Sequence, residues 1–241
     1  MEYTNIQLRK SEDRGHANHG WLNSYHSFSF ADYYAPAHMA YSVLRVINED
    51  VIAPAQGFGM HSHHDMEIIT YMLQGAIRHE DSIGNGSVIV AGDAQRMTAG
   101  TGVRHSEFNA SNQESAHLLQ IWLTPESVGI APSYEEKHFD AASKTNQWRL
   151  IASRDAREGS LLIHQNVDLF ATILAEGQRL DYSPRAGRNL YFQMARGRAT
   201  VNGIQLEQGD ALMISIEENL EVNAIEVVSQ TEAEILLFDL P

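Results

Sequence analysis

Two pairs of side chains in this sequence have the residue types and the spacing of metal ligands. His61 and His63 form a His-x-His pair, and His105 and Glu107 form a His-x-Glu pair further along the chain. Both pairs lie in segments that read as β-strand, where residues two apart point to the same face with Cα atoms about 6.7 Å apart. Two such strands facing each other would direct three imidazoles and one carboxylate at one point. The sequence therefore predicts a metal site formed by these four residues.

This donor set predicts an open, reactive site rather than a closed structural one. Three neutral imidazoles and one carboxylate leave a divalent ion with net positive charge. In octahedral geometry they also leave open positions, which an organic oxyanion and dioxygen could share. Such an ion lowers the pKa of a bound hydroxyl group, and Glu107 could remain a ligand or accept that proton as a general base. The donor types alone are compatible with Fe, Mn, Co, Ni, Cu or Zn.

Composition excludes several other classes of function. The 241 residues include no cysteine, which rules out disulfides, thiolate metal sites and cysteine nucleophiles. The chain has 17 basic and 31 acidic residues, a net charge of −14 and no run of Lys and Arg, so we expect no direct binding to nucleic acid. No apolar run approaches the roughly 18 residues that cross a bilayer, and the start lacks the apolar core of a secretory signal. We therefore expect a cytoplasmic protein without membrane association.

Short β-rich segments predict an all-β fold in two blocks. Between residues 41 and 124 they are YSVLRVI, MEIITYML, SVIVAGD and HLLQIWL, with turn signals such as IGNG between them. Strands at this spacing are typical of a sandwich or barrel. A second β-rich block runs from Gln147 to the end. The polar segment 125–146, which contains two prolines, reads as a connector with a helical turn around Tyr134–His138.

The two blocks share a weak self-similarity that predicts a duplicated barrel. In the first block YMLQG is followed by AGD, and in the second FQMARG is followed by QGD. Aligning the glycines of these segments shows which residues of the second block occupy the positions of the four predicted ligands. They are Ser183, Arg185, Val222 and Ala224. These residues are not a metal-binding set, so we expect the second block to cover the first, buttress it or form a dimer contact.

Longer stretches around the ligand pairs resemble known motifs. The span GFGMHSHHDMEIITYMLQG resembles the first cupin motif, and GDAQRMTAGTGVRHSEFN resembles the second. The segments RGHANHGWLNSYHSFSFADYY, HEDSIGN and MTAGTGVRHSE are similar to those of the pirin family of double cupins, over most of residues 14–125. The likeness is weaker beyond that region and ends in LLFDLP. It implies two jelly-roll barrels in tandem: a metal-binding barrel (1–125), a connector (126–146) and a barrel without a metal site (147–241).

The resemblance poses a choice between two carboxylates. Cupins commonly use the glutamate of the first motif, here Glu67, whereas pirins resemble this chain in taking the carboxylate from the second, here Glu107. Strand parity does not decide, because residues 61, 63 and 67 would share one strand face. One residue more than the cupin pattern separates Glu67 from Gly75, which indicates an irregularity that would turn Glu67 away. We expect Glu107 to be both ligand and catalytic carboxylate, and Glu67 to support the site or the fold.

The resemblance also implies a function. Bacterial pirins are similar to quercetin 2,3-dioxygenases, which open the central ring of a flavonol with O2 and release carbon monoxide. The implied cofactor is one divalent transition metal ion, Fe(II) first among those named above. Animal pirins resemble iron-dependent transcriptional cofactors, so the alternative is an iron-dependent redox sensor or interaction module with a protein partner. A metal-dependent isomerase, with the ion acting only as a Lewis acid, is a third hypothesis. We expect a monomer, because the two barrels can cover each other.

The other histidines are predicted to lie outside the metal site. His64 has the opposite strand parity and should be exposed, whereas His79 and His117 lie in strands without a partner and should be structural. The N-terminal histidines lack ligand spacing; they are His16, His19, His26 and His38.

Two aromatic segments complete the predictions. HSFSF, with Phe28 and Phe30, reads as a half-buried strand that packs in the core. Gln120 and Trp122 share one face of LLQIWL, and the sequence leaves their roles open.

Overall fold

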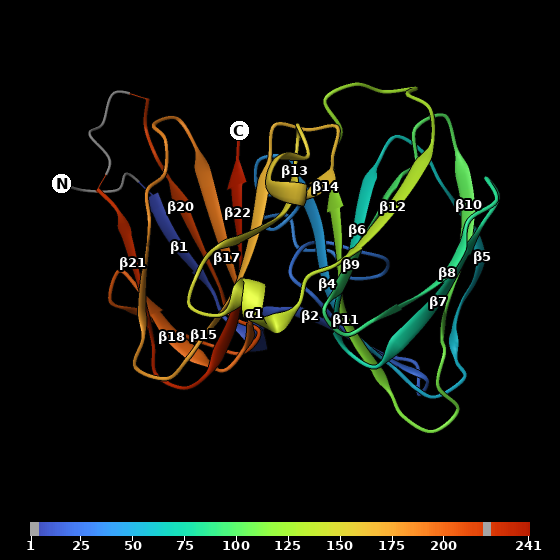
Figure 1. Cartoon of the computed structure of the whole chain (residues 1–241), viewed down its shortest axis with the longest axis horizontal. Helices are drawn as coiled ribbons and strands as arrows, with labels where there is room; N and C mark the ends of the chain where they lie inside the picture. The colour runs from blue at the N-terminus through green and yellow to red at the C-terminus, as the bar shows by residue number, and fades with distance from the viewer. Residues whose placement is uncertain (1–4, 219–222) are drawn as a thin grey trace.

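The computed structural model describes residues 5–218 and 223–241 and contains two β-barrels side by side (Figure 1). Each barrel consists of one seven-stranded and one four-stranded sheet. The seven-stranded sheets lie in the middle of the molecule, and the four-stranded sheets lie on the outside (Figure 1). The predicted all-β, double-barrel fold is therefore confirmed. Val222, one of the predicted counterpart positions, lies outside the described residues.

The first barrel holds the predicted metal site. Its seven-stranded sheet has the order β12 (Ser133–His138), β9 (Asp93–Thr98), β6 (Glu67–Gln74), β11 (Ala116–Leu123), β4 (Leu44–Ile52), β3 (Leu22–His26) and β2 (Gly15–Asn18). Its four-stranded sheet has the order β5 (Gly57–His63), β10 (Val103–Asn109), β7 (Ala76–Asp81) and β8 (Gly86–Val90). Every pairing in both sheets is antiparallel.

The second barrel repeats this topology except at one edge of its seven-stranded sheet, where the last two strands pair in parallel. Its seven-stranded sheet has the order β1 (Asn5–Arg9), β20 (Ala211–Ser215), β17 (Asn189–Arg196), β22 (Ala233–Leu240), β15 (Asp168–Leu174), β13 (Arg149–Ser153) and β14 (Leu161–Leu162). Its four-stranded sheet has the order β16 (Arg179–Tyr182), β21 (Ile225–Ser229), β18 (Arg198–Val201) and β19 (Ile204–Glu207). The helices are short: α1 (Ala141–Lys144) and the 3-10 turns Ser11–Asp13 and Arg157–Gly159. The described residues include no helix long and apolar enough to span a membrane.

The two barrels exchange edge strands. β1, from the start of the chain, pairs with β20 of the second barrel, whereas β12, from the predicted connector, pairs with β9 of the first barrel. The helical turn predicted over Tyr134–His138 is therefore wrong, because these residues form β12. Along this edge strand the side chains alternate between two faces, with a period of two rather than the 3.6 of a helix. One face carries Tyr134, Glu136 and His138, and the other carries Glu135 and Lys137. The domain boundaries at 125 and 146 stay a prediction.

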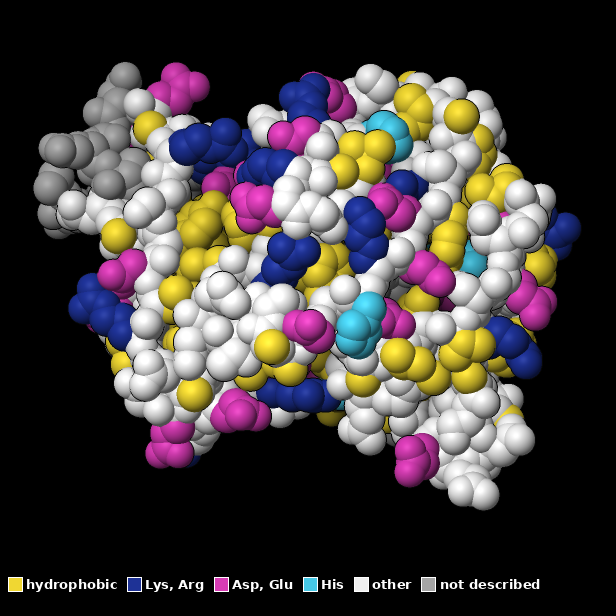
Figure 2. Space-filling view, viewed as in Figure 1, with side chains coloured by type: hydrophobic (Ala, Val, Ile, Leu, Met, Phe, Trp, Pro, Cys, Tyr) yellow, Lys and Arg dark blue, Asp and Glu magenta, His cyan; other side chains and the backbone are white. Residues whose placement is uncertain are grey.

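Charges of both signs are mixed on the surface. On the face shown in Figure 2, Lys and Arg side chains lie scattered among Asp and Glu, with apolar and uncharged polar side chains between them. Mixed signs of this kind keep the local field weak, even where the net charge of the chain is −14.

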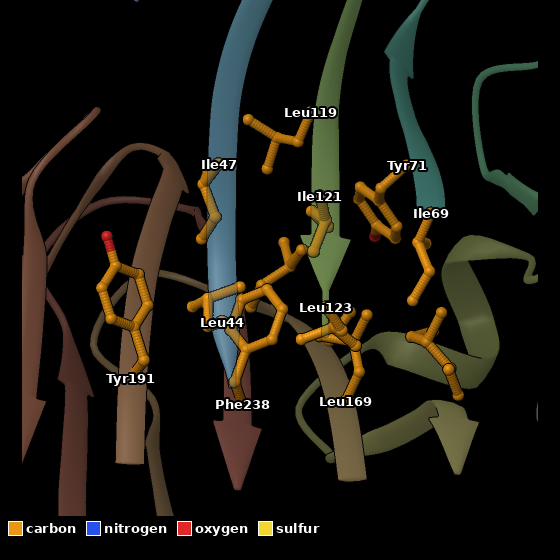
Figure 3. Packing of buried hydrophobic residues seen from close by; sticks show 14 of the residues in the cluster. Leu44, Ile47, Ile69, Tyr71, Leu119, Ile121, Leu123, Leu169, Tyr191 and Phe238 are labelled. Carbon is orange, nitrogen blue, oxygen red and sulfur yellow. The ribbon is translucent and has the colours of Figure 1, made fainter. Parts of the chain in front are cut away.

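The main hydrophobic core lies between the two seven-stranded sheets. Ile47, Ile121 and Leu123 of the first barrel point toward Tyr191 and Phe238 of the second (Figure 3). The central strands of both sheets are buried on both faces, as their β-branched and aromatic side chains favour. Apolar burial on this scale joins the barrels into one unit.

Truncating a side chain in this interface should destabilise the whole protein. Phe238 is fully buried, so Phe238→Ala should lower the free energy of unfolding by about 3–5 kcal/mol. Urea unfolding followed by tryptophan fluorescence measures this loss. Val128→Ala, at a side chain that is 74% exposed, serves as the control and should change the value by less than about 0.5 kcal/mol. If both substitutions lowered the free energy of unfolding equally little, the packing of Phe238 between the barrels would not stabilise the protein.

Candidate metal centre

Three of the four predicted ligands converge at one point of the first barrel. His61 and His63 lie on β5, and His105 lies on β10, where it is the direct cross-strand partner of His61. The ligand nitrogens of these three side chains all lie within 4.8 Å of one another. His105 is buried and the other two are partly exposed, so the cluster is open on one side.

The surroundings of the three imidazoles suit metal binding. His61 Nδ1 lies 2.8 Å from the carbonyl oxygen of Gly59 and donates to it, which leaves the lone pair on Nε2. That Nε2 lies 3.0 Å from Nε2 of His105. Burial, and then the neighbouring histidines, lower the pKa of His63 to about 4 and of His105 to about 3. Neutral, converging imidazole nitrogens are what a divalent transition metal ion requires, so these residues fit such an ion.

Glu107 is placed beside this cluster by a different set of contacts. Its carboxylate forms a second possible ligand group with His105 and His79. The side chain is 3% exposed and accepts hydrogen bonds from the opposite sheet. Thr70 Oγ1 and Gln95 Nε2 each donate to Oε1 at 3.2 Å, and Gln120 Nε2 donates to Oε2 at 3.1 Å. That Glu107 acts as a ligand stays a prediction.

A bulge and a glycine bring β5 and β10 into this arrangement. The register between the strands shifts between His105 and Glu107, so that Glu107 pairs with Phe58 while His105 pairs with His61. The extra residue in β5 lets Phe58 and His61 both face the barrel interior. At Gly57 a Cβ atom would lie 2.2 Å from the carbonyl oxygen of Glu107. Only glycine permits this close approach.

Glu67 lies on another strand and faces the other way. It was predicted to share one strand with His61 and His63, but β5 ends at His63 and Glu67 opens β6. Its buried carboxylate accepts hydrogen bonds from Thr98 Oγ1 at 3.0 Å and from the backbone N–H of His164 at 3.2 Å. β6 also carries an extra residue opposite β11, between Met72 and Gln74, within the stretch where the sequence indicated an irregularity. Glu67 thus ties the first barrel to the second.

The histidines outside the cluster have separate partners. The side chain of His64 is 83% exposed, as predicted. His117 lies 3.0 Å from Glu49, and His79 lies 3.3 Å from Asp81 and 3.5 Å from Gln95, so both ring nitrogens of His79 have neighbours. This agrees with structural roles, although His79 is also within ligand distance of His105 and Glu107.

The histidine cluster lines a cavity of about 850 Å³. Among the described residues that line it, five have Phe, Tyr or Trp side chains and none is Lys or Arg; the five are Trp21, Phe30, Tyr33, Phe58 and Trp122. Trp122 packs edge-on against His63, with ring centroids 4.9 Å apart. His16, His19 and His26 also line this space, whereas His38 does not.

The predicted HSFSF strand is wrong. β3 ends at His26, and the chain then turns. Phe28 packs into the core between the barrels, and Phe30 packs on Trp122 at the cavity. The turn separates two phenylalanines that an extended strand would place on the same face.

The sequence did not identify the side chains that hold Glu107. Thr70, Gln95 and Gln120 come from three adjacent strands, β6, β9 and β11, that are not adjacent in the chain. For Thr70 and Gln120 the one signal is a polar residue within a largely apolar strand, and Gln95 lies in a strand, DAQRMT, that gives no such signal. For Gln120 the sequence left the role open; its contact with Glu107 supplies one.

The second barrel has no comparable cluster among residues 5–218 and 223–241; both possible ligand groups lie in the first barrel. Ser183 and Arg185 follow the end of β16, and Ala224 precedes β21. No side chain of this set offers a metal an imidazole or a carboxylate.

Comparison with known proteins identifies the family. A family model described as "Pirin" matches residues 7–123, and one described as "Quercetinase C-terminal cupin domain" matches residues 150–240. A protein of Escherichia coli (strain K12) named quercetin 2,3-dioxygenase is 48% identical over 236 residues, which cover 98% of this chain and 99% of that protein. The chain belongs to the pirin family. A pirin-like protein of Caulobacter vibrioides is 40% identical to this pirin over 96% of this chain and 98% of the relative.

Solved structures agree with this assignment. The bacterial pirin YhhW from Escherichia coli, in complex with nickel(II), superposes on this pirin with a TM-score of 0.91 at 46% identity, covering 98% of this chain and 99% of that one. A quercetin 2,3-dioxygenase from Acinetobacter baumannii has a TM-score of 0.77 at 21% identity, over 99% of this chain and 86% of that one. The second likeness shows the fold alone. The metal of this pirin, and its ligands, stay predictions.

Adding a methyl group at Gly57 should weaken metal binding. The new Cβ would push β5 away from β10 and separate His61 from His105. We expect Gly57→Ala to bind less nickel(II) than the wild type in isothermal titration. Gly59→Ala is the matched control, because a Cβ there would meet no atom within 4 Å. Equal affinities of the two variants would show that the close approach does not position the ligands.

The neutral histidines should make the stability of the metal-free protein depend on pH. The pKa values of His63 and His105 in the folded state lie below the ordinary value of 6.5. The contribution of these two histidines to the free energy of unfolding is therefore complete above about pH 6.5 and is lost as the pH falls toward about 4. The urea midpoint of the metal-free wild type should decline more steeply over this range than that of His63→Asn, which has no imidazole to protonate there. Parallel declines would count against the lowered pKa.

Proposed function

We propose that this pirin is a metal-dependent dioxygenase that opens the central ring of quercetin or a related flavonol with O2 and releases carbon monoxide. One observation carries the proposal: neutral, converging imidazoles lie on the wall of an aromatic cavity of about 850 Å³. Cavities of this size and lining suit a flat aromatic ligand. The name of the relative from Escherichia coli supports the substrate class.

The metal would be held by His61, His63, His105 and Glu107. When bound, a divalent transition metal ion, with Fe(II) our first choice, would supply Lewis acidity toward the enolic oxygen of the flavonol and an open position for dioxygen. The donors exclude none of the other first-row ions, and nickel is the ion in the YhhW complex.

The contacts of Glu107 limit what its carboxylate can do. An ionised carboxylate has about four lone-pair sites. Hydrogen bonds from Thr70, Gln95 and Gln120 occupy three of them, two on Oε1 and one on Oε2. The remaining site, on Oε2, can bind the metal or accept the proton of the flavonol's enolic hydroxyl, but not both at once. Because the three donors fix the carboxylate, neither role requires it to reorganise.

The cavity walls supply orientation and exclude water. Trp122 stands against His63 and Phe58 against His61, so both sides of the cluster are apolar. A flavonol between these rings would be held flat and shielded from solvent, which strengthens the electrostatic interactions at the site.

The assignment predicts a specific reaction. Fe(II)-loaded protein mixed with quercetin without oxygen should not bleach the flavonol absorbance, although binding at the metal shifts its wavelength. Admission of O2 should bleach it, with one carbon monoxide released per flavonol. Gas analysis of the headspace measures the carbon monoxide. Bleaching without release of carbon monoxide would contradict the proposal.

Two glutamates provide the matched test of the site. Glu107→Gln should lower kcat/KM at least about 100-fold, because a neutral amide neither neutralises the metal nor takes up a proton. Glu67→Gln should retain its metal and most of its activity, because Glu67 faces the second barrel. Elemental analysis of both variants separates loss of metal from loss of catalysis. The reverse pattern would assign the carboxylate to the first cupin motif.

A further inference from the structure

A row of polar side chains crosses the inner face of the seven-stranded sheet in the first barrel. Its members are direct cross-strand partners on β9, β6, β11, β4 and β3. In that order they are Gln95, Thr70, Gln120, Asn48 and His26. All are buried, the most exposed being Gln120 at 8%. Adjacent strands are about 4.8 Å apart, so His26 lies roughly 10 Å from Gln120 along the row.

The two ends of the row differ in how their polar groups are satisfied. Gln95, Thr70 and Gln120 all donate to Glu107. Asn48 and His26 lie beyond it and line the cavity. Two residues away on the same strands, Asp50 of β4 and Ser24 of β3 are also cross-strand partners, and both line the cavity. We call Ser24, His26, Asn48 and Asp50 the polar quartet.

The quartet presents acceptors that have no donor within the described part of the protein. Ser24 bonds to Asp50, and His26 Nε2 lies 2.9 Å from the Ser24 hydroxyl. With the serine donating to Asp50, His26 donates through Nε2 and keeps a lone pair on Nδ1. Three buried atoms then lack a partner: His26 Nδ1, Asn48 Oδ1 and Asp50 Oδ1. Unpaired buried polar atoms are costly, and these three belong to side chains that line the cavity, where a small rotation of each side chain would present its acceptor to a ligand.

The second barrel shows that the fold does not require a polar row. The corresponding partners on β20, β17, β22, β15 and β13 are Leu212, Phe192, Leu237, Phe170 and Leu150. All are apolar, and none of them lines the cavity described above. The same position in the sheet is thus filled by hydrocarbon in one barrel and by amides, an imidazole and a hydroxyl group in the other. The polar row therefore serves binding rather than folding.

The chemistry of the wall selects the ligand group. Unpaired acceptors require a donor, and the absence of Lys and Arg from the cavity lining disfavours carboxylates and phosphates. Burial raises the pKa of Asp50 to about 7, so this carboxyl group is about half ionised at neutral pH, and its negative charge disfavours an anionic group over an uncharged donor. Aromatic neighbours such as Phe30 and Trp21 suit a ring. A phenolic hydroxyl combines both properties.

We propose that the polar quartet is a subsite that binds the phenolic hydroxyls on an outer ring of the substrate, while the enolic end lies at the histidine cluster. The proposal rests on the flavonol function proposed above and adds the basis of substrate selectivity. Ser24, His26, Asn48 and Asp50 select polyhydroxylated flavonols over the unsubstituted ring system. Each hydroxyl seated there gains hydrogen bonds that the protein leaves unmade.

The test compares two flavonols that differ only in outer-ring hydroxyls. 3-Hydroxyflavone keeps the enolic hydroxyl and lacks the outer ones, whereas quercetin has both. Fluorescence titrations of Fe(II)-loaded protein without oxygen give both dissociation constants. In the wild type the affinity ratio should favour quercetin by about tenfold, as expected for two neutral hydrogen bonds. Asn48→Leu and Asp50→Leu should each reduce this ratio about threefold, and the double variant should bring it close to one.

Three controls separate binding from structure. Asp50→Asn keeps an acceptor oxygen and the shape of the side chain, so it should preserve the ratio. Asn189→Leu makes the same change as Asn48→Leu on a strand of the second barrel and should also preserve it. The thermal midpoint of Asn48→Leu should not fall, because leucine replaces an unpaired polar group; a purely structural asparagine would lower it. A lower midpoint together with an unchanged ratio would overturn the subsite.

The outcomes distinguish this proposal from the dioxygenase assignment. If both flavonols bind with a ratio that Asn48→Leu and Asp50→Leu leave unchanged, the subsite is wrong and the assignment stands. If the ratio responds as expected but O2 yields no carbon monoxide, the subsite stands and the assignment is wrong. If neither flavonol binds, both are wrong.

Discussion

The buried carboxylate of Glu107 is the constraint on which the interior of the first barrel depends. With 3% of its surface exposed, it has lost its hydration and must be compensated by hydrogen bonds. Thr70, Gln95 and Gln120 supply them from three neighbouring strands, whose register fixes where each donor stands. β10 carries both Glu107 and His105, so the same bonds anchor the strand that faces His61. The inner sheet thereby positions ligands that lie on the outer sheet.

The two barrels separate what the fold requires from what function requires. Both have the same strand order and, apart from the parallel pair β13–β14, the same antiparallel pairing, so the topology alone demands neither a metal cluster nor a polar interior. The second barrel fills its interior with side chains such as Phe192, Leu212 and Leu237. The first accepts buried polar groups, some unpaired, at the equivalent positions. Function therefore resides in the side chains grafted on one copy of a shared scaffold.

The sequence predicted the features that depend on local spacing and missed those that depend on register. Residues two apart share a strand face, so the convergence of His61 with His63 could be predicted, as could the two barrels from their repeated segments. The crossing of β1 into the second barrel could not, because a strand reveals its own pattern but not its partner. For the same reason the donors to Glu107 were missed. The contacts of Glu67 agree with the supporting role expected for it, but Glu67 opens β6, whereas the strand that was expected to carry it ends at His63.

The second barrel explains how the first can contain so polar a cavity. β4, β6 and β11 are buried on both faces, and their residues alternate between two tasks. Ile47, Ile69 and Ile121 face the second barrel and contribute to the shared core. Of their neighbours on the opposite face, Asn48 lines the cavity and Thr70 donates to Glu107. Apolar burial on the face toward the second barrel supplies the stability that the polar face toward the cavity lacks. Of the roles expected for the second barrel, covering, buttressing or dimer contact, the packing favours the buttress: it stabilises a sheet whose other face is free to bind.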